Sequence, residues 1–472
     1  MTESRPNVVW VTLESVRADH TSVHGYGRDT TPNLERIAAR ADGARFGNCF
    51  SQSIWTPASS ASMLTGTHLF RHGVGLDGNA EEPLRSDLRT VPELLGENGY
   101  FTACLSSNPY LSAATGLDRG FEKFSWLSLK HLYKHRETVL PMLAYIARLR
   151  TYAHGFSLEG HEHNLTYVMQ RVLQRWVQSF GRGDDPFFLY VHCPNPHLPY
   201  TPPEKYIDRY LTDDEFAPEA ALDLSFERYG SQERVIENIA DGADFTDREW
   251  RTIEALYDAE IAYADELVGR LFDTVEALDG RETVFVVTGD HGDLFGEQGL
   301  VGHNLVLDDG LTNVPLVTHN LDTDEVDTES LVQHIDVTRT VAARLGCDHE
   351  QFQGRPLSET PYDTVISQRG VAQFESYLDV DPGFDTDRFH ADPVSAVRTG
   401  EFKYLESEAR TELFRLPDET EDVEAHYPHT AARLRAELGR RIDNPHPTAG
   451  PSADETNFTP EMREQLSDLG YI

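Results

Sequence analysis

Four residues that lie far apart in the chain have side chains suited to binding a metal ion and attacking an ester. They are Glu14, Thr56 and the adjacent pair Asp290 and His291. Carboxylate oxygens and an imidazole nitrogen bind divalent cations such as Mn²⁺, Ca²⁺ or Zn²⁺. A hydroxyl on such an ion loses its proton more easily and becomes a nucleophile. The combination predicts attack on a phosphate or sulfate ester.

The positions of these residues would bring them to one edge of a sheet. Strand-like apolar runs over residues 8–13 and 283–288 precede Glu14 and Asp290, and Thr56 stands just before a helix-compatible stretch. In an open α/β sheet, the carboxyl ends of the strands meet at the crevice where ligands bind. A helix N-terminus behind the hydroxyl would also favour the anionic oxygens of a substrate.

The sequence pattern predicts an α/β fold that can hold such a crevice. Up to about residue 345, strand-like and helix-like segments alternate, which is typical of a mostly parallel sheet with helices on both faces. Compact apolar runs at 101–105 and 186–191 suit central strands. Apolar residues at helical spacing predict helices over 164–180 and 249–278.

The chain divides by character into two parts. We expect a catalytic domain over residues 1–355 and a smaller C-terminal α+β subdomain over 356–472. Short strand-like segments at 395–398 and 402–405 predict a short antiparallel sheet in the second part. A Pro/Gly/Asp-rich linker over 444–457 would lead to a tail helix near the C-terminus.

Two insertions interrupt the predicted catalytic domain. Residues 125–155 are basic, with Glu137 as almost the only acid. We interpret them as a helical lid over the site, and contact with a membrane surface or an acidic partner is the alternative. Residues 204–250 are acidic and interrupted by Pro and Gly, which predicts a long surface loop with short helices.

The charge balance restricts the partners of this chain. Its 472 residues include 79 acidic against 41 basic ones, for a net charge of −38, and only five of the basic residues are Lys. This composition is typical of halophilic proteins of haloarchaeal type, since molar salt screens self-repulsion within a few Å. It argues against nucleic acid as a partner, because phosphate backbones need basic surfaces. The oligomeric state is not determined by the sequence.

Cysteine use and hydropathy predict a cytoplasmic location. The four cysteines show no CxxC spacing and lie in or near apolar segments, which indicates buried free thiols. The N-terminal residues run directly into the first predicted strand without a signal-peptide pattern. We expect no integral membrane span, because no apolar run reaches the necessary length.

Ordered motifs along nearly the whole chain resemble those of the sulfatase family, within the alkaline-phosphatase-like superfamily. The motifs are the opening segment 7–20, Gly25-Tyr26-Gly27, Thr31-Pro32-Asn33-Leu34, Ser62-Met63-Leu64-Thr65-Gly66, Arg71-His72-Gly73-Val74, Gly116-Leu117-Asp118-Arg119-Gly120-Phe121, Pro196-His197-Leu198-Pro199-Tyr200, Tyr257-Asp258-Ala259-Glu260, Thr288-Gly289-Asp290-His291-Gly292, Gly302-His303, Val314-Pro315-Leu316, Ala396-Val397-Arg398-Thr399-Gly400 and Leu469-Gly470-Tyr471. The resemblance implies the alkaline-phosphatase-like fold.

The resemblance also implies roles for individual residues. One divalent metal ion (Mn²⁺, Ca²⁺ or Zn²⁺) would be bound by Glu14, Thr56, Asp290 and His291, with Thr56 also the nucleophile. Other residues would contact the transferring group or protonate the leaving oxygen, and these are His197, His303 and, as a residue lining the site, Asn108. We interpret His72 and His192 as structural.

The chain departs from the main type of sulfatase at the nucleophile. Those enzymes carry a Cys or Ser in a C/S-x-P-x-R motif and oxidise it to formylglycine. Here Thr56 is followed by Pro57, and Thr cannot give the aldehyde, so no formylglycine is expected. The first carboxylate is Glu14 rather than the more common Asp. Thr with Glu resembles the phosphoglycerol transferases of lipoteichoic acid synthesis.

The resulting hypothesis is a metal-dependent hydrolase that cleaves a sulfate or phosphate ester through Thr56. Its substrate would be a small anionic ester of a sugar, lipid or aryl alcohol. One alternative is a phosphodiesterase or phosphoglycerol-type transferase that uses the same hydroxyl. A second alternative is a non-catalytic protein that binds anionic glycans or lipids.

Overall fold

The computed structural model describes residues 5–80, 82–128, 132, 136–152, 165–212, 214–323, 326–359, 363–442 and 458–468. The predicted linker 444–457, the terminal motif at 469–471, and Lys130 and Lys134 of the basic insertion lie outside the described residues.

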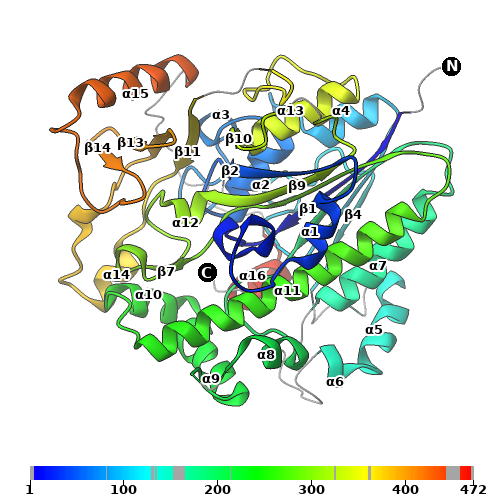
Figure 1. Ribbon diagram of the computed structural model, residues 1–472, viewed down its shortest axis with the longest axis horizontal. Helices are drawn as coiled ribbons and strands as arrows, with labels where there is room; N and C mark the ends of the chain where they lie inside the picture. The colour runs from blue at the N-terminus through cyan, green and yellow to red at the C-terminus, as the bar shows by residue number, and fades with distance from the viewer. Residues whose placement is uncertain are drawn as a thin grey trace.

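Within the described residues, eight strands form a central sheet in the order β10-β2-β9-β6-β1-β5-β3-β4 (Figure 1). Neighbouring strands are parallel, except that β9 runs antiparallel to both β2 and β6. The predicted mostly parallel α/β sheet is therefore confirmed. The strands are β1 Asn7–Leu13, β2 Gly43–Phe50, β3 Phe101–Ser106, β4 Lys123–Trp126, β5 Phe187–Cys193, β6 Thr283–Gly289, β9 Asn313–His319 and β10 Leu331–Gln333.

Helices cover both faces of this sheet, as predicted (Figure 1). Side chains alternate along β1, so that Val9 and Val11 join the core with α7 and α11, whereas Val8 and Trp10 join the core with α2, α4 and α13. The helices are α1 Pro32–Ala38, α2 Thr56–Thr65, α3 Leu69–His72, α4 Val91–Glu97, α7 Thr166–Phe180, α8 Glu204–Tyr210, α9 Pro218–Tyr229, α10 Gln232–Ala240, α11 Asp247–Glu276, α12 Asp309–Thr312, α13 His334–Arg344 and α14 Glu375–Val380.

Local chemistry sets the start of the two helices that matter most for the site. The long helix α11 begins with a capping box, in which Thr246 and Glu249 satisfy each other's backbone N–H groups. The sequence pattern places Thr56 just before a helix, whereas α2 begins at Thr56 itself and has Trp55 as its N-cap. Pro57 suits this first turn, because proline lacks a backbone N–H and an N–H at this position would have no partner within the helix. Gly66, with φ of 66°, ends the helix.

The sequence pattern predicted the secondary structure of the two insertions unequally well. Within the described part of 125–155, α5 Val139–Ile146 packs on α7, and α6 Leu149–Tyr152 packs on α8. A lid function for this segment stays a prediction. The expectation of a long loop over 204–250 underestimates its order, because most of that segment forms α8, α9 and α10.

A second sheet of four antiparallel strands forms in the described C-terminal part, as predicted. Its strands are β11 Val365–Arg369, β12 Val394–Arg398, β13 Phe402–Glu406 and β14 Thr411–Arg415. The helix α15 Pro428–Arg441 packs Leu434 and Leu438 against it. The predicted domain boundary near residue 355 stays a prediction.

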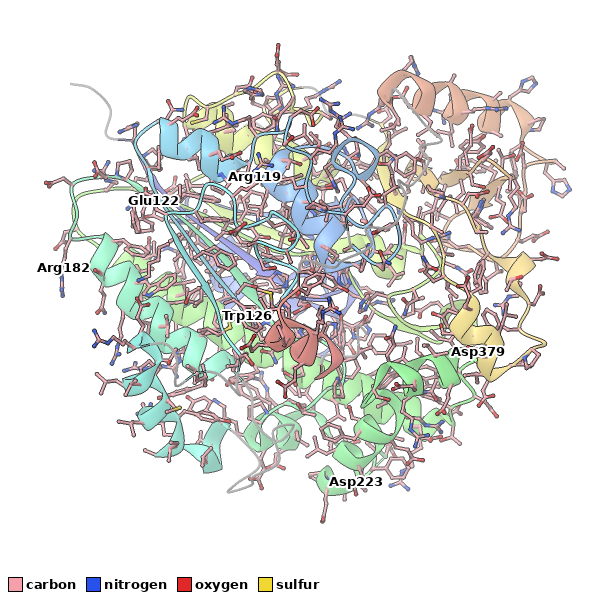
Figure 2. All side chains as sticks on the ribbon, turned by 180° about the vertical axis from the view of Figure 1, so that it is seen from behind. Arg119, Glu122, Trp126, Arg182, Asp223 and Asp379 are labelled. Atoms are coloured by element: carbon pink, nitrogen blue, oxygen red, sulfur yellow. The ribbon has the colours of Figure 1, made fainter. Side chains whose placement is uncertain are left out.

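The tail helix α16 Pro460–Asp468 returns to the larger part of the molecule (Figure 2). Its Leu466 packs with Ala80 and Tyr110, close to Trp55 at the start of α2. Among the described helices, none combines the length and the apolar content that crossing a membrane requires.

Candidate active site

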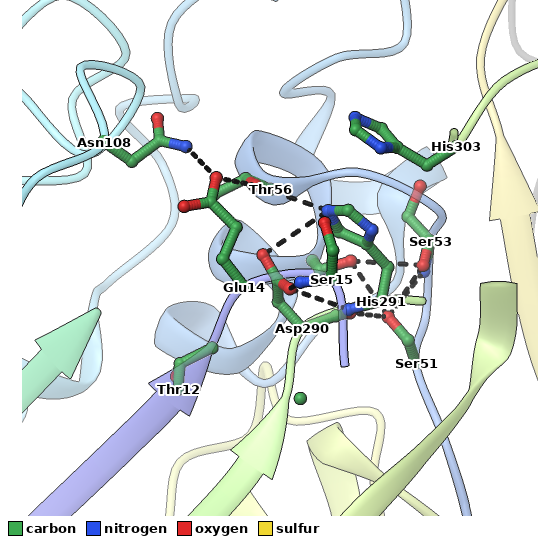
Figure 3. A network of polar contacts seen from close by, with 12 residues as sticks. Thr12, Glu14, Ser15, Ser51, Ser53, Thr56, Asn108, Asp290, His291 and His303 are labelled. Atoms are coloured by element: carbon green, nitrogen blue, oxygen red, sulfur yellow. Dashed lines mark hydrogen bonds and ion pairs between the residues drawn. The ribbon is translucent and has the colours of Figure 1, made fainter. Parts of the chain in front are cut away.

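The ends of two adjacent parallel strands bring the predicted carboxylates together. Leu13 of β1 pairs with Gly289 of β6, so that Glu14 and Asp290 leave the sheet side by side (Figure 3). Ser15 takes a left-handed conformation, with φ of 62°, and its N–H donates to Asp290 Oδ1 at 2.9 Å. This strained turn fixes the orientation of the Asp290 carboxylate.

Thr56 presents its hydroxyl to both the carboxylate and the imidazole of the predicted metal set (Figure 3). Its Oγ1 lies 3.2 Å from Glu14 Oε1 and 3.4 Å from His291 Nε2, and the side chain is fully buried. His291 Nδ1 lies 2.9 Å from Gly292 O, which directs Nε2 towards the hydroxyl. Asn108, which follows β3, donates from Nδ2 to Glu14 Oε1 and so fixes that carboxylate from the other side.

The two remaining predicted histidines lie next to this group. The ring centroids of His303 and His291 are 4.5 Å apart, and those of His303 and His197 are 5.5 Å apart. His303 Nδ1 lies 2.8 Å from Asp293 Oδ1, and the hydroxyl of Tyr200 donates to Asp293 Oδ2 at 2.8 Å. All seven predicted site residues therefore converge on one region of the structure.

Burial and charge shift the pKa values of His291 and His303 in opposite directions. Burial, with the charge of His303 adding to it, lowers the pKa of His291 to about 3. Burial also acts to lower the pKa of His303, but its hydrogen bond to Asp293 and the negative charges of Asp293, Asp290 and Glu14 together outweigh burial and raise the pKa above the ordinary value. His291 is therefore neutral, with a lone pair on Nε2, whereas His303 holds its proton more tightly than a free imidazole does.

The carboxylates of the site are suited to a bound cation. Burial raises the pKa of Asp290 to about 6, with the charge of His192 opposing and that of Glu14 adding to the shift. Within the described part of the chain, Asp290 Oδ2 has no hydrogen-bond partner, although such buried atoms are usually satisfied. Two buried carboxylates, a neutral imidazole and a hydroxyl fit a divalent ion that Glu14, Thr56, Asp290 and His291 would hold.

A second cluster of side chains could in principle bind a metal ion, but hydrogen bonding explains its geometry. The donor atoms of His291, Asp293 and His303 lie within 4.8 Å of one another. The contact between Asp293 and His303 is a hydrogen bond of ordinary length, so Asp293 orients the imidazole of His303.

Sequence reasoning missed two residues at this site. Asp293 directly follows the Asp-His-Gly motif, and this position close to Asp290 and His291 in the sequence was the available signal. His192 lies 3.5 Å from Glu14 Oε2, whereas we interpreted it as structural. That interpretation suits His72, whose ring nitrogens contact Ser62 Oγ and the N–H of Val74.

A cavity of about 260 Å³ adjoins the two histidines that could face a leaving group. It is lined by His197 and His303 together with residues of the C-terminal part, among them Arg369 and Gln373. A substrate bound at Thr56 could therefore extend towards the second sheet.

A model of the family described as "Sulfatase" matches residues 6–347 of this chain. The chain belongs to the sulfatase family. The choline-sulfatase of Rhizobium meliloti (strain 1021) is 26% identical over 427 residues, which cover 86% of this chain and 79% of that protein. The arylsulfatase of Clostridium perfringens is 24% identical over 325 residues, which cover 62% of this chain and 64% of that protein.

Solved structures agree with the sulfatase fold. The phosphonate monoester hydrolase of Agrobacterium radiobacter superposes with a TM-score of 0.68, at 19% identity, over 92% of this chain and 95% of that one. The corresponding enzyme of Silicibacter pomeroyi superposes with a TM-score of 0.67, at 19% identity, over 93% and 96%. Family membership and fold indicate an ester hydrolase.

Proposed function

We propose that this sulfatase-family enzyme is a metal-dependent hydrolase that cleaves a sulfate or phosphate ester with Thr56 as the nucleophile. The observation that supports this most is the position of Thr56 Oγ1, 3.2 Å from Glu14 Oε1 and 3.4 Å from His291 Nε2, at the first residue of α2. The free N–H groups of that helix start favour an anion there. The substrate would be a small anionic ester of a sugar, lipid or aryl alcohol.

In the first half of the reaction, Thr56 Oγ1 bonds to the sulfur or phosphorus as the bond to the alcohol oxygen breaks. The hydroxyl proton passes to Glu14 Oε1, the acceptor that it already faces. His303 gives its proton to the departing oxygen, and His197 stands beside it to assist. When bound, the ion would supply positive charge that lowers the pKa of the hydroxyl and neutralises substrate oxygens.

In the second half, water attacks the sulfo- or phospho-threonine. His303 takes the proton of this water, and Thr56 recovers its own proton from Glu14 as inorganic sulfate or phosphate leaves. Transfer to an acceptor alcohol would follow the same steps with a hydroxyl in place of water, which is the phosphoglycerol-type alternative. The identity of the ion, Mn²⁺, Ca²⁺ or Zn²⁺, and a cytoplasmic location stay predictions.

The decisive test compares Thr56→Ala with Thr56→Ser. We expect the alanine variant to lose at least about 10³-fold in kcat, because no other hydroxyl replaces the nucleophile. The serine variant keeps the hydroxyl and should keep measurable turnover. Turnover of nitrophenyl sulfate, nitrophenyl phosphate, a phosphate diester and a phosphonate monoester should be measured in parallel with each metal ion. Mass spectrometry of acid-quenched enzyme should locate the sulfo or phospho group on Thr56.

A matched control is Ser62→Ala, which removes a buried hydroxyl of the same helix that contacts His72 instead of Glu14. This variant should keep its turnover. Full activity in Thr56→Ala would reject Thr56 as the nucleophile. Binding of anionic glycans or lipids without turnover of any ester, in wild type as well, would favour the non-catalytic alternative.

A further inference from the structure

His192 is a fully buried histidine that the proposed reaction does not use. It lies near the end of β5, where it pairs with Thr12 of β1, one residue pair before Leu13 and Cys193. Alternation along β5 places Phe188 and Tyr190 in the core on the α2 side, and His192 shares their face. Its side chain therefore lies on the side of the sheet from which Thr56 approaches the metal set.

The ring of His192 closes a circle of potential ligand atoms. Its Nε2 lies 3.5 Å from Glu14 Oε2 and 4.0 Å from Asp290 Oδ2. Asp290 Oδ2 in turn lies 3.6 Å from His291 Nε2. Thr56 Oγ1 completes the circle, since it lies 3.4 Å from His291 and 3.2 Å from the other oxygen of Glu14.

These distances are those expected of atoms that share one ion. With bonds of about 2.1 Å, two ligand atoms stand about 3.0 Å apart at a right angle and about 4.2 Å apart on opposite sides of the ion. Each of the five separations lies within that range. All five are longer than the usual hydrogen-bond distance of about 2.9 Å, and of the five only the two made by Thr56 are hydrogen bonds.

The polar contacts of His192 point to the same two carboxylates, Glu14 and Asp290, with which it can form long ion pairs. Within the described residues, neither of its ring nitrogens has a hydrogen-bond partner, and the same is true of Asp290 Oδ2. Leaving such buried groups without a partner destabilises the folded protein. An ion between them would satisfy His192 and Asp290 together.

We propose that His192 Nε2 is a fifth protein ligand of the metal ion, an inference that rests on the proposed function. The ion is then held by two imidazoles, two carboxylates and one hydroxyl. Imidazole nitrogen favours transition metals, whereas Ca²⁺ and Mg²⁺ prefer oxygen ligands throughout. His192 therefore selects Mn²⁺ or Zn²⁺ over Ca²⁺.

The test measures metal binding on the purified full-length protein rather than activity. Titration calorimetry of His192→Leu should show Mn²⁺ affinity lowered by at least about 100-fold, because loss of a direct ligand exceeds the effect of an outer partner. Ca²⁺ affinity should change much less, so that the preference for Mn²⁺ falls. X-ray absorption of the Zn²⁺-loaded protein should count two imidazoles in wild type and one in His192→Leu.

Two further variants separate the possible results. His72→Leu replaces another fully buried histidine on the α2 side of the sheet and should leave Mn²⁺ affinity unchanged. Asp290→Ala should abolish binding in either case. If Asp290→Ala loses Mn²⁺ while His192→Leu binds it as wild type does, the role of His192 is wrong and the proposed function stands. If wild type itself binds no divalent ion, both proposals fail.

Discussion

The pKa values of His291 and His303, whose rings are in contact, shift in opposite directions because their other neighbours differ. Burial lowers the pKa of His291 to about 3, and its Nδ1 faces the carbonyl of Gly292. His303 is also buried, but Asp293 at 2.8 Å stabilises its charged form and raises its pKa. The proposed metal ligand and the proposed proton donor can therefore keep separate roles although their ring centroids are 4.5 Å apart.

The first prediction concerns Asp293, which acts through His303. We expect Asp293→Asn to lower kcat by about 10²–10⁴-fold for esters of alkyl alcohols, since those leaving groups need a proton. Nitrophenyl esters, whose leaving group is stable as an anion, should lose much less. The measurement is kcat over a series of esters that differ only in the pKa of the leaving alcohol.

Tyr200→Phe serves as the control for this experiment. It removes a single hydrogen bond to Asp293 and keeps the carboxylate, so that its effect should be smaller but should follow the same leaving-group trend. An equal loss across the whole ester series in Asp293→Asn would mean that Asp293 supports the fold of the site rather than the proton donor.

Residues at strand ends could be predicted from sequence, and residues that act through others could not. Glu14 and Asp290 each follow an apolar run, and strand pairing then brings them together. His192 also follows such a run, but a single histidine is more often structural, and only its distances to Glu14 and Asp290 reveal a second possibility. Asp293 reaches His303 through a turn whose direction no periodicity encodes.

At the scale of elements, α11 holds the loop that carries His197. Glu260 of this helix accepts a hydrogen bond from the N–H of Thr201 at 2.8 Å and another from Asn195 Nδ2. These two contacts lie on either side of His197 in the chain. A single buried side chain of a long, rigid helix therefore positions one of the predicted histidines.

The second prediction follows from the burial of Glu260, which raises its pKa from 4.5 to about 8. Its folded-state pKa is above the unfolded one, so the stability that it contributes is fully present below pH 4.5 and is lost as the pH rises through about 8. We expect wild type to lose about 1.4 kcal/mol per pH unit against Glu260→Gln within this window. The measurement is the free energy of unfolding of both proteins at several pH values in constant salt.

Glu204→Gln is a suitable control, because Glu204 is exposed in the first turn of α8. The difference between wild type and this variant should not change over the same pH range. If wild type and Glu260→Gln gave parallel curves of stability against pH, Glu260 would be ionised in the folded protein and the prediction would be wrong.

The elements themselves were predictable where periodicity is strong. The apolar face of α11 and the continuous apolar run of β1 identify both elements within two residues of their observed bounds. The antiparallel direction of β9 was not predictable, because a buried strand shows the same apolar run in either orientation. The helices α8 to α10 were underestimated because Pro and Gly between them read as loop signals, although Pro218 stands at the start of α9.

At the scale of the molecule, polar contacts attach the second sheet to the first. The fully buried Lys403 of β13 lies 2.6 Å from Asp309 Oδ1 at the start of α12 and 2.6 Å from Glu419 Oε2. The N–H of Gln368 in β11 donates to the carbonyl of Gln52, four residues before Thr56. The contacts of Lys403 with Asp309 and of Gln368 with Gln52 join residues 94 and 316 positions apart and carry no local pattern. The sequence could therefore indicate a C-terminal subdomain but not how it meets the site.

Acidic residues outnumber basic ones along the chain, and some of them are exposed on helices of the surface. Exposed carboxylates such as Asp223 on α9 and Asp379 on α14 lie on elements that are far apart in the chain (Figure 2). With 79 acidic and 41 basic residues, ion pairing can neutralise at most about half of the acids. Exposed ion pairs each stabilise the fold by only about 0–1 kcal/mol. The response of the folded state to salt therefore depends mainly on the acidic residues that have no basic partner.

The third prediction is that high salt stabilises the folded protein. The Debye length falls from about 10 Å at 0.1 M to about 3 Å at 1 M, which removes repulsion between neighbouring surface carboxylates while leaving contacts within the core unchanged. We expect the unfolding midpoint in thermal scans to rise by about 10 °C or more between 0.1 M and 2 M KCl, since each kcal/mol corresponds to a few degrees.

Two comparisons show whether charge screening is the cause of such a rise. Replacing exposed carboxylates, beginning with Asp223→Asn and Asp379→Asn, should raise the midpoint at 0.1 M KCl and reduce its dependence on salt, because fewer charges remain to be screened. Sulfate stabilises proteins by its exclusion from their surface even when net charge is small. A midpoint that rises in ammonium sulfate but stays constant in KCl would therefore mean that self-repulsion does not limit this fold, and the acidic surface would need another explanation.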